Sequence, residues 1–141
     1  MGSDMWKYLT LILSMTQLQA GVVALTILAE ARGEGKDGMA AVACVINQRA
    51  INRGITPEQV CLQRKQFSCW NGKSESDLKS LYKSPMAKWA LYLEENIEAM
   101  NREKVGYADH YYSTIISPPY WAKNKKPVAH IGQHKFYKLR K

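Results

Sequence analysis

The stretch LTILAEARGEGKDGMAAVACVINQRA, residues 25–50, decides the fold. Two apolar runs with helical spacing are joined here by a short polar segment that contains Glu30, Glu34 and a pair of glycines. Apolar residues at the period of a helix predict one helix over 15–32 and a second over 37–52, and the glycines end the first of them. The chain therefore places two carboxylates at the end of a hydrophobic helix, where it turns back into its own core.

The remainder of the chain predicts a mainly α protein, of the α+β kind, with a small β element near the C-terminus. The segment RGITPEQV predicts a turn and a short helix over 57–63, with a Thr cap and a Pro in its first turn. Apolar spacing predicts a short helix over 75–82 and a long helix over 85–102. The segments ADHYYST (108–114) and KFYKL (135–139) have the composition of strands, and the Pro-rich segment between them has that of a loop.

The chain is expected to divide into an N-terminal segment over 1–14 and one domain over 15–141. No repeat or low-complexity linker interrupts residues 15–141. MGSD resembles the remnant of an expression tag, and MWKYLTLILSMTQLQA (5–20) shares a lysine, a short apolar run and a small residue with signal peptides. The competing interpretation is a helix start, because Ser14 and Gln17 form the pattern of a capping box. No stretch is long and apolar enough to predict a membrane span.

The 141-residue chain carries a net charge of +8, with a cluster of cations and no acid at its C-terminal end. These residues are Lys123, Lys125, Lys126, Lys135, Lys138, Arg140 and Lys141. Such a balance indicates an anionic partner, which is a nucleic acid, an acidic membrane surface or an acidic cell-wall polymer. A solvated basic tail explains the same charges equally well.

Three cysteines, Cys44, Cys61 and Cys69, show neither a C-x-x-C motif nor the Cys/His spacing of a metal site. Their odd number disfavours a disulfide framework, so we expect reduced thiols. His130 and His134 are four residues apart, but a metal pair at this spacing needs a helix and a third ligand, and a glycine lies between them. We therefore expect no metal and no cofactor, and a His134 that is structural or hydrogen-bonded at a cleft.

The apolar surroundings of Glu30 indicate chemistry. A carboxyl group on the apolar side of a helix is desolvated, so its pKa is expected to rise, and a Glu that stays protonated near neutral pH can serve as a general acid. If the helix continues through Glu34, the two carboxylates share one face, with roughly 6 Å between their Cβ atoms. An ion pair of Glu30 with Arg32 or Arg49 on a helix surface is the alternative that spacing alone leaves open.

Five motifs together resemble the cell wall hydrolase family that is typified by the spore cortex-lytic enzyme SleB. Their order and spacing match over about residues 18–138, nearly the whole chain. They are AEARGE (29–34), GMAAVACVINQR (38–49), QFSCW (66–70), WA (121–122) and IGQHKFY (131–137). The resemblance implies a lysozyme-like fold of the lytic transglycosylase type, an enzyme that acts on the glycan strands of peptidoglycan, and Glu30 as the catalytic acid.

The mechanism that the resemblance implies needs a single acid. Glu30 would protonate the glycosidic oxygen between N-acetylmuramic acid and N-acetylglucosamine and then, as a carboxylate, deprotonate the 6-hydroxyl that attacks within the same sugar. A lysozyme-type muramidase that uses water is the alternative, and Glu34 or Asp37 would position that water. For Glu34 the sequence also leaves open a hydrogen bond to substrate, a contact with Arg32, or a role in solubility alone.

Aromatic residues are the expected contacts to sugar rings. Phe67 and Trp70 lie in a turn-rich loop, where they either anchor the loop to the core or stack on sugar, and Trp121 either faces substrate or plugs its loop. Tyr111 and Tyr112 alternate along a strand-like segment, so one faces the core and the other the cleft. The family pattern implies an aromatic residue beside the catalytic Glu, and we favour Tyr112. The predicted substrate-binding residues are Glu34, Phe67, Trp70, Tyr112, Trp121 and His134.

The chain departs from spore enzymes of this type, which carry an additional wall-binding domain and an export signal. The sequence has essentially the catalytic region, which favours a lone endolysin, such as a phage lysis protein, or a small wall-remodelling enzyme. We expect a monomer that acts in the cell wall or periplasm, made in the host cytoplasm if it is a phage protein. The basic C-terminus would hold it to anionic wall polymers or lipopolysaccharide.

A basic nucleic-acid-binding module is the rival from another class. The net charge and the interleaved Tyr, Trp and Lys residues over 107–141 favour it. Against it, no predicted helix has a basic face, no helix-turn-helix or RNP pattern is present, and the acidic helix end over 30–34 would repel phosphate. The sequence therefore favours an enzyme, with no nucleic acid as its partner.

Overall fold

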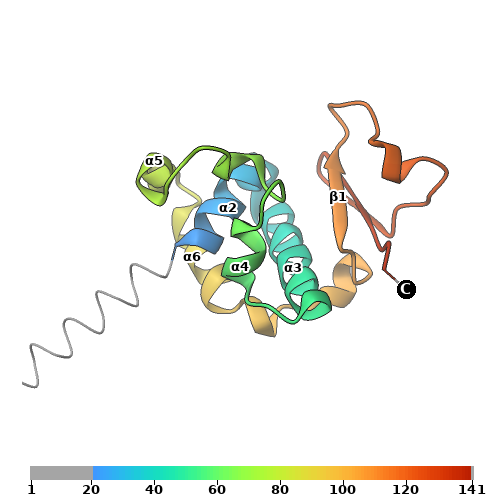
Figure 1. Cartoon of the computed structure of the whole chain (residues 1–141), viewed down its shortest axis with the longest axis horizontal. Coiled ribbons are helices and arrows are strands. Elements are labelled where there is room, and N and C mark those ends of the chain that lie inside the picture. Colours follow the sequence, from blue (N-terminus) through green and yellow to red (C-terminus); the bar gives the residue numbers. More distant parts are fainter. Residues whose placement is uncertain (1–20, 141) are drawn as a thin grey trace, which may run out of the picture.

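The structure is a computed structural model that describes residues 21–140 (Figure 1). The predicted segment over 1–14, its capping box and the first turns of the helix expected over 15–32 lie outside the described residues. Within residues 21–140, no helix is both long and apolar enough to cross a membrane.

Two consecutive helices form the centre of the helical part. α2 (Val22–Ala31) is buried on nearly all sides, with eight of its ten residues inside, as expected for a helix that is apolar all round. α3 (Gly35–Arg53) runs for 19 residues and ends before Gly54, which has a left-handed conformation. Both predicted helices are confirmed, and the polar segment between them forms a 3-10 turn, η1 (Arg32–Glu34).

A side chain from another helix caps the N-terminus of α2. The carboxylate of Glu94, in α6 (Ala87–Glu95), accepts hydrogen bonds from the backbone amides of Gly21 at 2.9 Å and Ala24 at 2.7 Å. Amides at the start of a helix lack acceptors within the helix, and an anion is favoured there. The cap therefore ties α2 to α6.

Shorter helices complete the helical part. α4 (Pro57–Leu62) begins with a capping box between Thr56 and Gln59, as the sequence predicts. The short helix predicted over 75–82 is present as a helical turn followed by a 3-10 segment. The helical turn is α5 (Glu75–Leu78) and the 3-10 segment is η3 (Lys79–Lys83). Another 3-10 turn, η2 (Ser68–Trp70), precedes them.

The prediction of one long helix over 85–102 is wrong. α6 ends at Glu95, and two 3-10 turns follow it, η4 (Ile97–Ala99) and η5 (Arg102–Val105). The helix ends at Asn96, whose backbone has φ −106° and ψ 16° and whose side-chain amide donates to the Tyr92 carbonyl at 2.8 Å. Asn terminates helices in this way because its side chain competes for backbone hydrogen bonds.

A three-stranded antiparallel sheet follows the helices in the order β1-β3-β2. Its strands are β1 (His110–Ser113), β2 (Ala129–Ile131) and β3 (His134–Tyr137). β1 and β3 confirm the two predicted strands, whereas β2 is too short for its pattern to predict it. β2 and β3 are joined by a two-residue turn, in which Gly132 has a φ of +58° that glycine adopts without steric cost.

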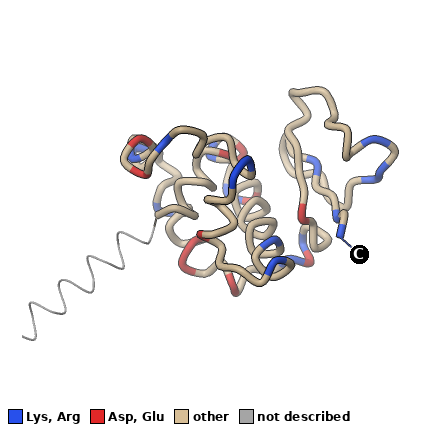
Figure 2. The backbone as a smooth tube through the Cα atoms, viewed as in Figure 1, with Lys and Arg blue, Asp and Glu red and all other residues tan. Residues whose placement is uncertain are grey.

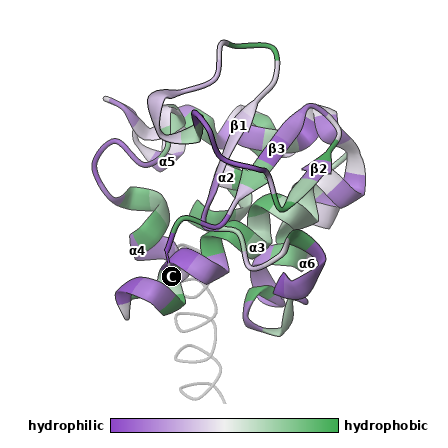
Figure 3. Ribbon diagram, turned by 90° about the vertical axis from the view of Figure 1, so that its right-hand side faces the viewer, coloured by the Kyte–Doolittle hydropathy of each residue, from purple (hydrophilic) through white to green (hydrophobic). Residues whose placement is uncertain are grey.

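The two faces of the sheet have different neighbours because successive residues of a strand point to opposite sides. Tyr111 and Phe136, which are paired across β1 and β3, lie on the face that packs toward the helices, and Phe136 is fully buried against α3. Tyr112 and Tyr137 lie on the other face, where Trp121 covers them. The sheet therefore stands beside α3 (Figure 1), and apolar stretches of α2 and α3 form the interior (Figure 3). This is the mainly helical architecture with a late β element that the sequence predicts.

Candidate active site

A cavity of about 420 Å³ lies where the helical part meets the β2–β3 turn. One wall is formed by residues 29–34, which contain both carboxylates of the AEARGE motif. Ser113, Gln133 and His134 contribute to the opposite wall. The fold thus brings together two of the five motifs, AEARGE and IGQHKFY, and adds Ser113 from the end of β1.

Glu30 lies in the last turn of α2, with its carboxyl group partly buried at the cavity wall. The hydroxyl of Tyr111 donates a hydrogen bond to Glu30 Oε2 at 3.0 Å. Burial raises the pKa of Glu30 above its ordinary value, and this effect outweighs the lowering by the Tyr111 hydrogen bond and by the Arg49 charge. The environment therefore favours a protonated carboxyl group that can donate its proton.

Two polar side chains near Glu30, Tyr111 and Arg49, act on its carboxyl group. Burial and the Glu30 charge raise the pKa of Tyr111 well above its ordinary value, so the phenol keeps its proton and acts as a donor. Arg49 Nε donates to the backbone carbonyl of Asp109 at 2.7 Å, and its guanidinium lies 5.4 Å from the centre of the Phe67 ring. Arg49 therefore acts on Glu30 as a nearby charge rather than as an ion-pair partner.

The predicted alternative, an ion pair of Glu30 with an arginine, is not formed. Arg32 Nη1 instead donates to the Leu28 carbonyl at 3.2 Å. Within residues 21–140, no Lys or Arg side chain lies within 4.0 Å of a carboxylate oxygen, and the one contact of this kind joins His110 Nδ1 to Asp109 Oδ1 at 2.9 Å.

Glu30 and Glu34 do not share one face of a continuous helix, the arrangement that the sequence allowed only if the helix continued through Glu34. The helix breaks at Ala31, whose φ of −145° is outside the helical range, and Glu34 belongs to the 3-10 turn η1. Glu34 Oε2 accepts a hydrogen bond from the backbone amide of Gln133 at 2.9 Å. Glu34 therefore joins the helical part to the β2–β3 turn, a role that the sequence did not predict.

His134 lies on the cavity wall and is only 5% exposed. Its ring centre is 5.1 Å from that of Tyr111. Burial lowers the pKa of His134, and the Glu34 charge offsets this only in part, so the neutral ring is favoured at neutral pH. Among the described residues Nδ1 of His134 is buried and has no hydrogen-bond partner.

Phe67 and Trp70 anchor their loop to the helical core. Phe67 is 3% exposed and belongs to the main core cluster, and Trp70 Nε1 donates to Thr26 Oγ1 in α2 at 2.8 Å. Burial, and to a lesser extent the Glu30 charge, raises the pKa of Cys69 to about 11. Of the two interpretations of these aromatics, the structure therefore supports anchoring.

The preference for Tyr112 as the aromatic residue beside Glu30 is wrong. Tyr111 occupies that place, and Tyr112 points to the opposite face of β1 because the two are neighbours in a strand. Trp121 packs on the same outer face, with its ring centre 5.4 Å from Tyr137 and 5.1 Å from His110. Trp121 thus closes a small aromatic cluster and does not line the cavity.

Sequence reasoning offered Tyr111 only as the less favoured of two candidates, and it missed Ser113 and Gln133 as residues of the site. Tyr111 and Ser113 are two apart on β1, so they share a face, and the small polar Ser113 marks that face as the one that meets the cavity. This signal could have identified Tyr111. Gln133 carries no such signal because it contributes only its backbone amide.

The described residues include no group of three or more His, Cys, Asp or Glu side chains that could hold a metal ion. All three cysteines are free. The cavity lining offers acid–base and hydrogen-bonding groups, which can support proton transfer.

The model of the Cell Wall Hydrolase family matches residues 33–137 of the chain. The matched range contains Glu34, Tyr111 and His134 and begins just after Glu30. No curated protein and no solved structure matched the chain.

Proposed function

Because the chain belongs to the cell wall hydrolase family, we propose that it cleaves the glycan strands of peptidoglycan between N-acetylmuramic acid and N-acetylglucosamine, as a lytic transglycosylase with Glu30 as its single acid and base. The observation that carries this proposal is the Glu30 carboxyl group itself. It sits at the wall of a cavity, its pKa is raised by burial, and Tyr111 fixes one of its oxygens at 3.0 Å. These are the properties required of a general acid near neutral pH.

The reaction proceeds in two proton transfers at the same carboxyl group. Glu30 first gives its proton to the glycosidic oxygen, and the bond between that oxygen and C1 of the muramic acid breaks. The resulting carboxylate then takes the proton of the sugar's own 6-hydroxyl as O6 bonds to C1. The product is a 1,6-anhydro sugar, no water is consumed, and Glu30 returns to its protonated form.

Tyr111 is the positioning residue in this proposal. Its hydroxyl binds one carboxyl oxygen of Glu30 and leaves the other for the substrate. The bond also stabilises the carboxylate that forms after the first transfer, because hydrogen bonds to a charged acceptor are stronger than those to a neutral one. Glu34 and His134, whose side chains share the cavity with Glu30, are the proposed contacts to the sugar.

A muramidase that uses water is the second candidate, and one observation favours it. Glycosidases that hydrolyse their substrate use two carboxyl groups, and Glu34 places a second one in the same cavity. However, Glu34 Oε2 is already bound to the Gln133 amide. The single-acid mechanism therefore makes better use of the groups that are free.

We also propose that the enzyme acts on the wall as a monomer in cell lysis or wall remodelling, and that its basic C-terminus contributes to retention on anionic wall polymers or lipopolysaccharide. The net charge of +8 supports this attraction.

Mass spectrometry of the fragments released from purified peptidoglycan tests the proposed reaction. The intact chain should release fragments with anhydro-muramic ends, and Glu30→Gln should lower the rate by roughly 100- to 10,000-fold. Glu98→Gln, which removes the same charge from an exposed position, should leave it unchanged.

Reducing ends in place of anhydro ends would establish the muramidase instead. Undiminished release by Glu30→Gln would show that the acid is another residue. No release by the intact chain would favour a binding protein, which a salt-dependent gel shift with DNA would then identify.

A further inference from the structure

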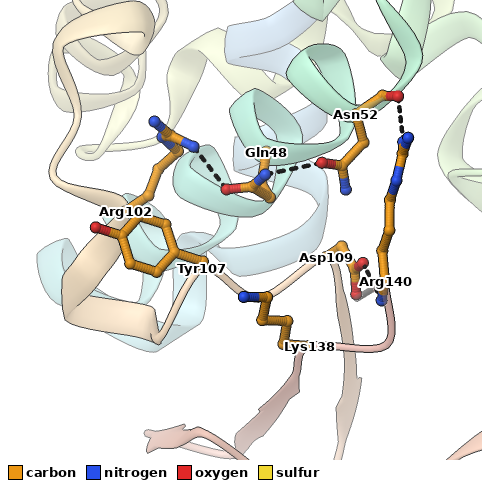
Figure 4. Close-up of a pocket in the computed structure, with 7 residues that line it drawn as sticks. All are labelled: Gln48, Asn52, Arg102, Tyr107, Asp109, Lys138 and Arg140. Atoms are coloured by element: carbon orange, nitrogen blue, oxygen red, sulfur yellow. Dashed lines mark hydrogen bonds between the residues drawn. The ribbon is translucent and has the colours of Figure 1, made fainter.

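A second cavity, of about 200 Å³, lies at the other end of α3 from the candidate active site (Figure 4). Gln48 and Asn52 from the last turns of α3 form one wall. Arg102 and Tyr107 form a second wall, and the C-terminal segment after β3 forms a third. The mechanism proposed for Glu30 uses none of these residues.

Three cations converge on this cavity from two distant parts of the sequence. Arg102 Nη1 donates to Gln48 Oε1 at 2.7 Å, and its guanidinium lies 5.5 Å from the centre of the Tyr107 ring. Lys138 Nζ lies 5.9 Å from the same ring. Arg140 donates to the backbone carbonyl of Asn52 at the end of α3. Within residues 21–140 none of the three cations has a carboxylate within 4.0 Å.

The one acid in the lining, Asp109, is already fully used by the protein. Its Oδ2 accepts from the Arg140 amide at 2.9 Å, and its Oδ1 accepts from the Leu139 amide and from His110 Nδ1, also at 2.9 Å. Burial alone would raise the pKa of Asp109, but these hydrogen bonds lower it below its ordinary value, so the carboxylate is ionised and satisfied. It turns toward the backbone of the C-terminal segment.

The acceptors of the lining amides are occupied as well. Gln48 Oε1 is bound by Arg102, and Asn52 Oδ1 accepts from Gln48 Nε2 at 2.9 Å. The groups that remain for a ligand are therefore donors, on Arg102, Lys138 and Asn52. A cavity with surplus donors and positive charge suits a ligand that brings several acceptors and negative charge.

We propose that this cavity is a binding site for a phosphate group. Guanidinium and ammonium groups together complement the oxygens of a phosphate, which accepts from several directions at once. The cavity is of the size of such a group with its immediate attachments, and no aliphatic side chain lines it, so it offers nothing to an acyl chain. The molecule that we propose to supply this phosphate group is the phosphodiester of an anionic wall polymer. That choice of molecule rests on the proposed function, whereas the binding of a phosphate group does not.

The site is distinct from a diffuse attraction by the basic C-terminal region. Lys123, Lys125 and Lys126 are exposed and lie in the loop before β2, whereas Lys138 lines the cavity at the end of α3 (Figure 4). Lys and Arg are spread over several parts of the backbone (Figure 2). The loop lysines line no part of the cavity. They therefore provide a matched control with the same charges in another place.

Amide chemical shifts of the full chain, followed while inorganic phosphate is added at constant ionic strength, test the site directly. We expect saturable shifts centred on Tyr107, Leu139 and Arg140. The double variant Arg102→Gln/Lys138→Gln should weaken the binding of phosphate by about tenfold or more, because each substitution removes a charge-assisted contact. Arg102→Lys/Lys138→Arg, which keeps both charges, should restore most of the binding and would show that the loss is not one of folding.

The control Lys125→Gln/Lys126→Gln removes the same two charges and should change the binding of phosphate by less than about twofold. Equal losses in the two double variants would overturn the site in favour of diffuse charge. An absence of saturable shifts with the intact chain would overturn it altogether.

Sedimentation with insoluble walls identifies the source of the phosphate. Retention of the intact chain should fall when the phosphodiester polymer is stripped from the walls, and Arg102→Gln/Lys138→Gln should be retained on untreated walls no better than on stripped ones. Stronger retention on vesicles of an anionic phospholipid than on untreated walls would replace the wall polymer with a lipid headgroup. Glu30→Gln should be retained like the intact chain, so a failure of the catalytic proposal would not disturb this result.

Discussion

The hydrogen bond between Tyr111 and Glu30 makes a quantitative prediction for the variant Tyr111→Phe. The bond lowers the pKa of Glu30 against the larger effect of burial, so its removal raises that pKa further. A hydrogen bond to a charged group contributes about 1.5–3 kcal/mol, and one pH unit corresponds to about 1.4 kcal/mol. Because Glu30 works as an acid in its protonated form, the alkaline limb of the activity profile should move up by roughly one to two pH units.

The assay is the pH dependence of kcat/KM for release of soluble fragments from purified peptidoglycan. The alkaline limb of this quantity reports the acid in the free enzyme. Below that limb the variant should be slower than the parent but still active, because the proton donor is present while the carboxylate that forms has lost its hydrogen bond. Tyr120→Phe is the matched control, because it removes the same hydroxyl from a side chain that is 89% exposed, and its profile should not move.

An alkaline limb that stays in place in Tyr111→Phe would refute the reasoning. It would mean either that the titrating acid is not Glu30 or that the bond to Tyr111 is absent in solution. A limb that moves to lower pH would be equally damaging, because the lost bond can only disfavour the carboxylate.

Three further variants test the structure around the site. Burial raises the pKa of Glu30 in the folded state, so the carboxyl group contributes its full stability below the ordinary Glu pKa. That contribution is lost as the pH rises through the folded pKa. In denaturant titrations, Glu30→Gln should therefore be more stable than the parent above the folded pKa of Glu30, and not below the ordinary Glu pKa. Gly132→Ala should lower the free energy of unfolding by about 1–2 kcal/mol in thermal melts, because a φ of +58° and the Glu34 carboxylate both oppose a Cβ atom, whereas Gly33→Ala, with nothing within 4 Å, should have little effect. Glu94→Ala should cost about 1–2 kcal/mol in the same measurement, because the first amides of α2 lose their acceptor.

Much of the helical part could be predicted because its signals are local. The apolar runs on both sides of the AEARGE motif are long enough for their period to be clear, and the Thr and Pro at the start of α4 specify its first turn. Glu30 was a candidate for the same reason, because a carboxyl group directly after Leu28 and Ala29 stands out in the local sequence. The long helix over 85–102 failed because one Asn outweighed a favourable apolar pattern.

The rest of the site depends on which parts of the chain meet, and no local pattern encodes that. The choice between Tyr111 and Tyr112 required the register of a short strand, in which a shift of one residue exchanges the two faces. The contact of Glu34 with Gln133 joins residues that are 99 positions apart. The cavity proposed for phosphate likewise contains Arg102 and Lys138, which come from separate segments. The run of C-terminal cations in the sequence therefore did not reveal that Lys138 and Arg140 line a cavity.

The hydrogen bond between Glu34 and the Gln133 amide also has a consequence for the opening of the cavity rim. Phe136 packs the sheet against α3 through buried contacts. At the cavity rim, the hydrogen bond of 2.9 Å joins the β2–β3 turn to η1. All three cysteines are free, so no disulfide links the described walls of the cavity. A local fluctuation that breaks this hydrogen bond would open the cavity rim without unfolding the core. Hydrogen exchange at the Gln133 amide would report the frequency of that opening, and exchange at the buried Val45 in α3 would report only the unfolding of the whole.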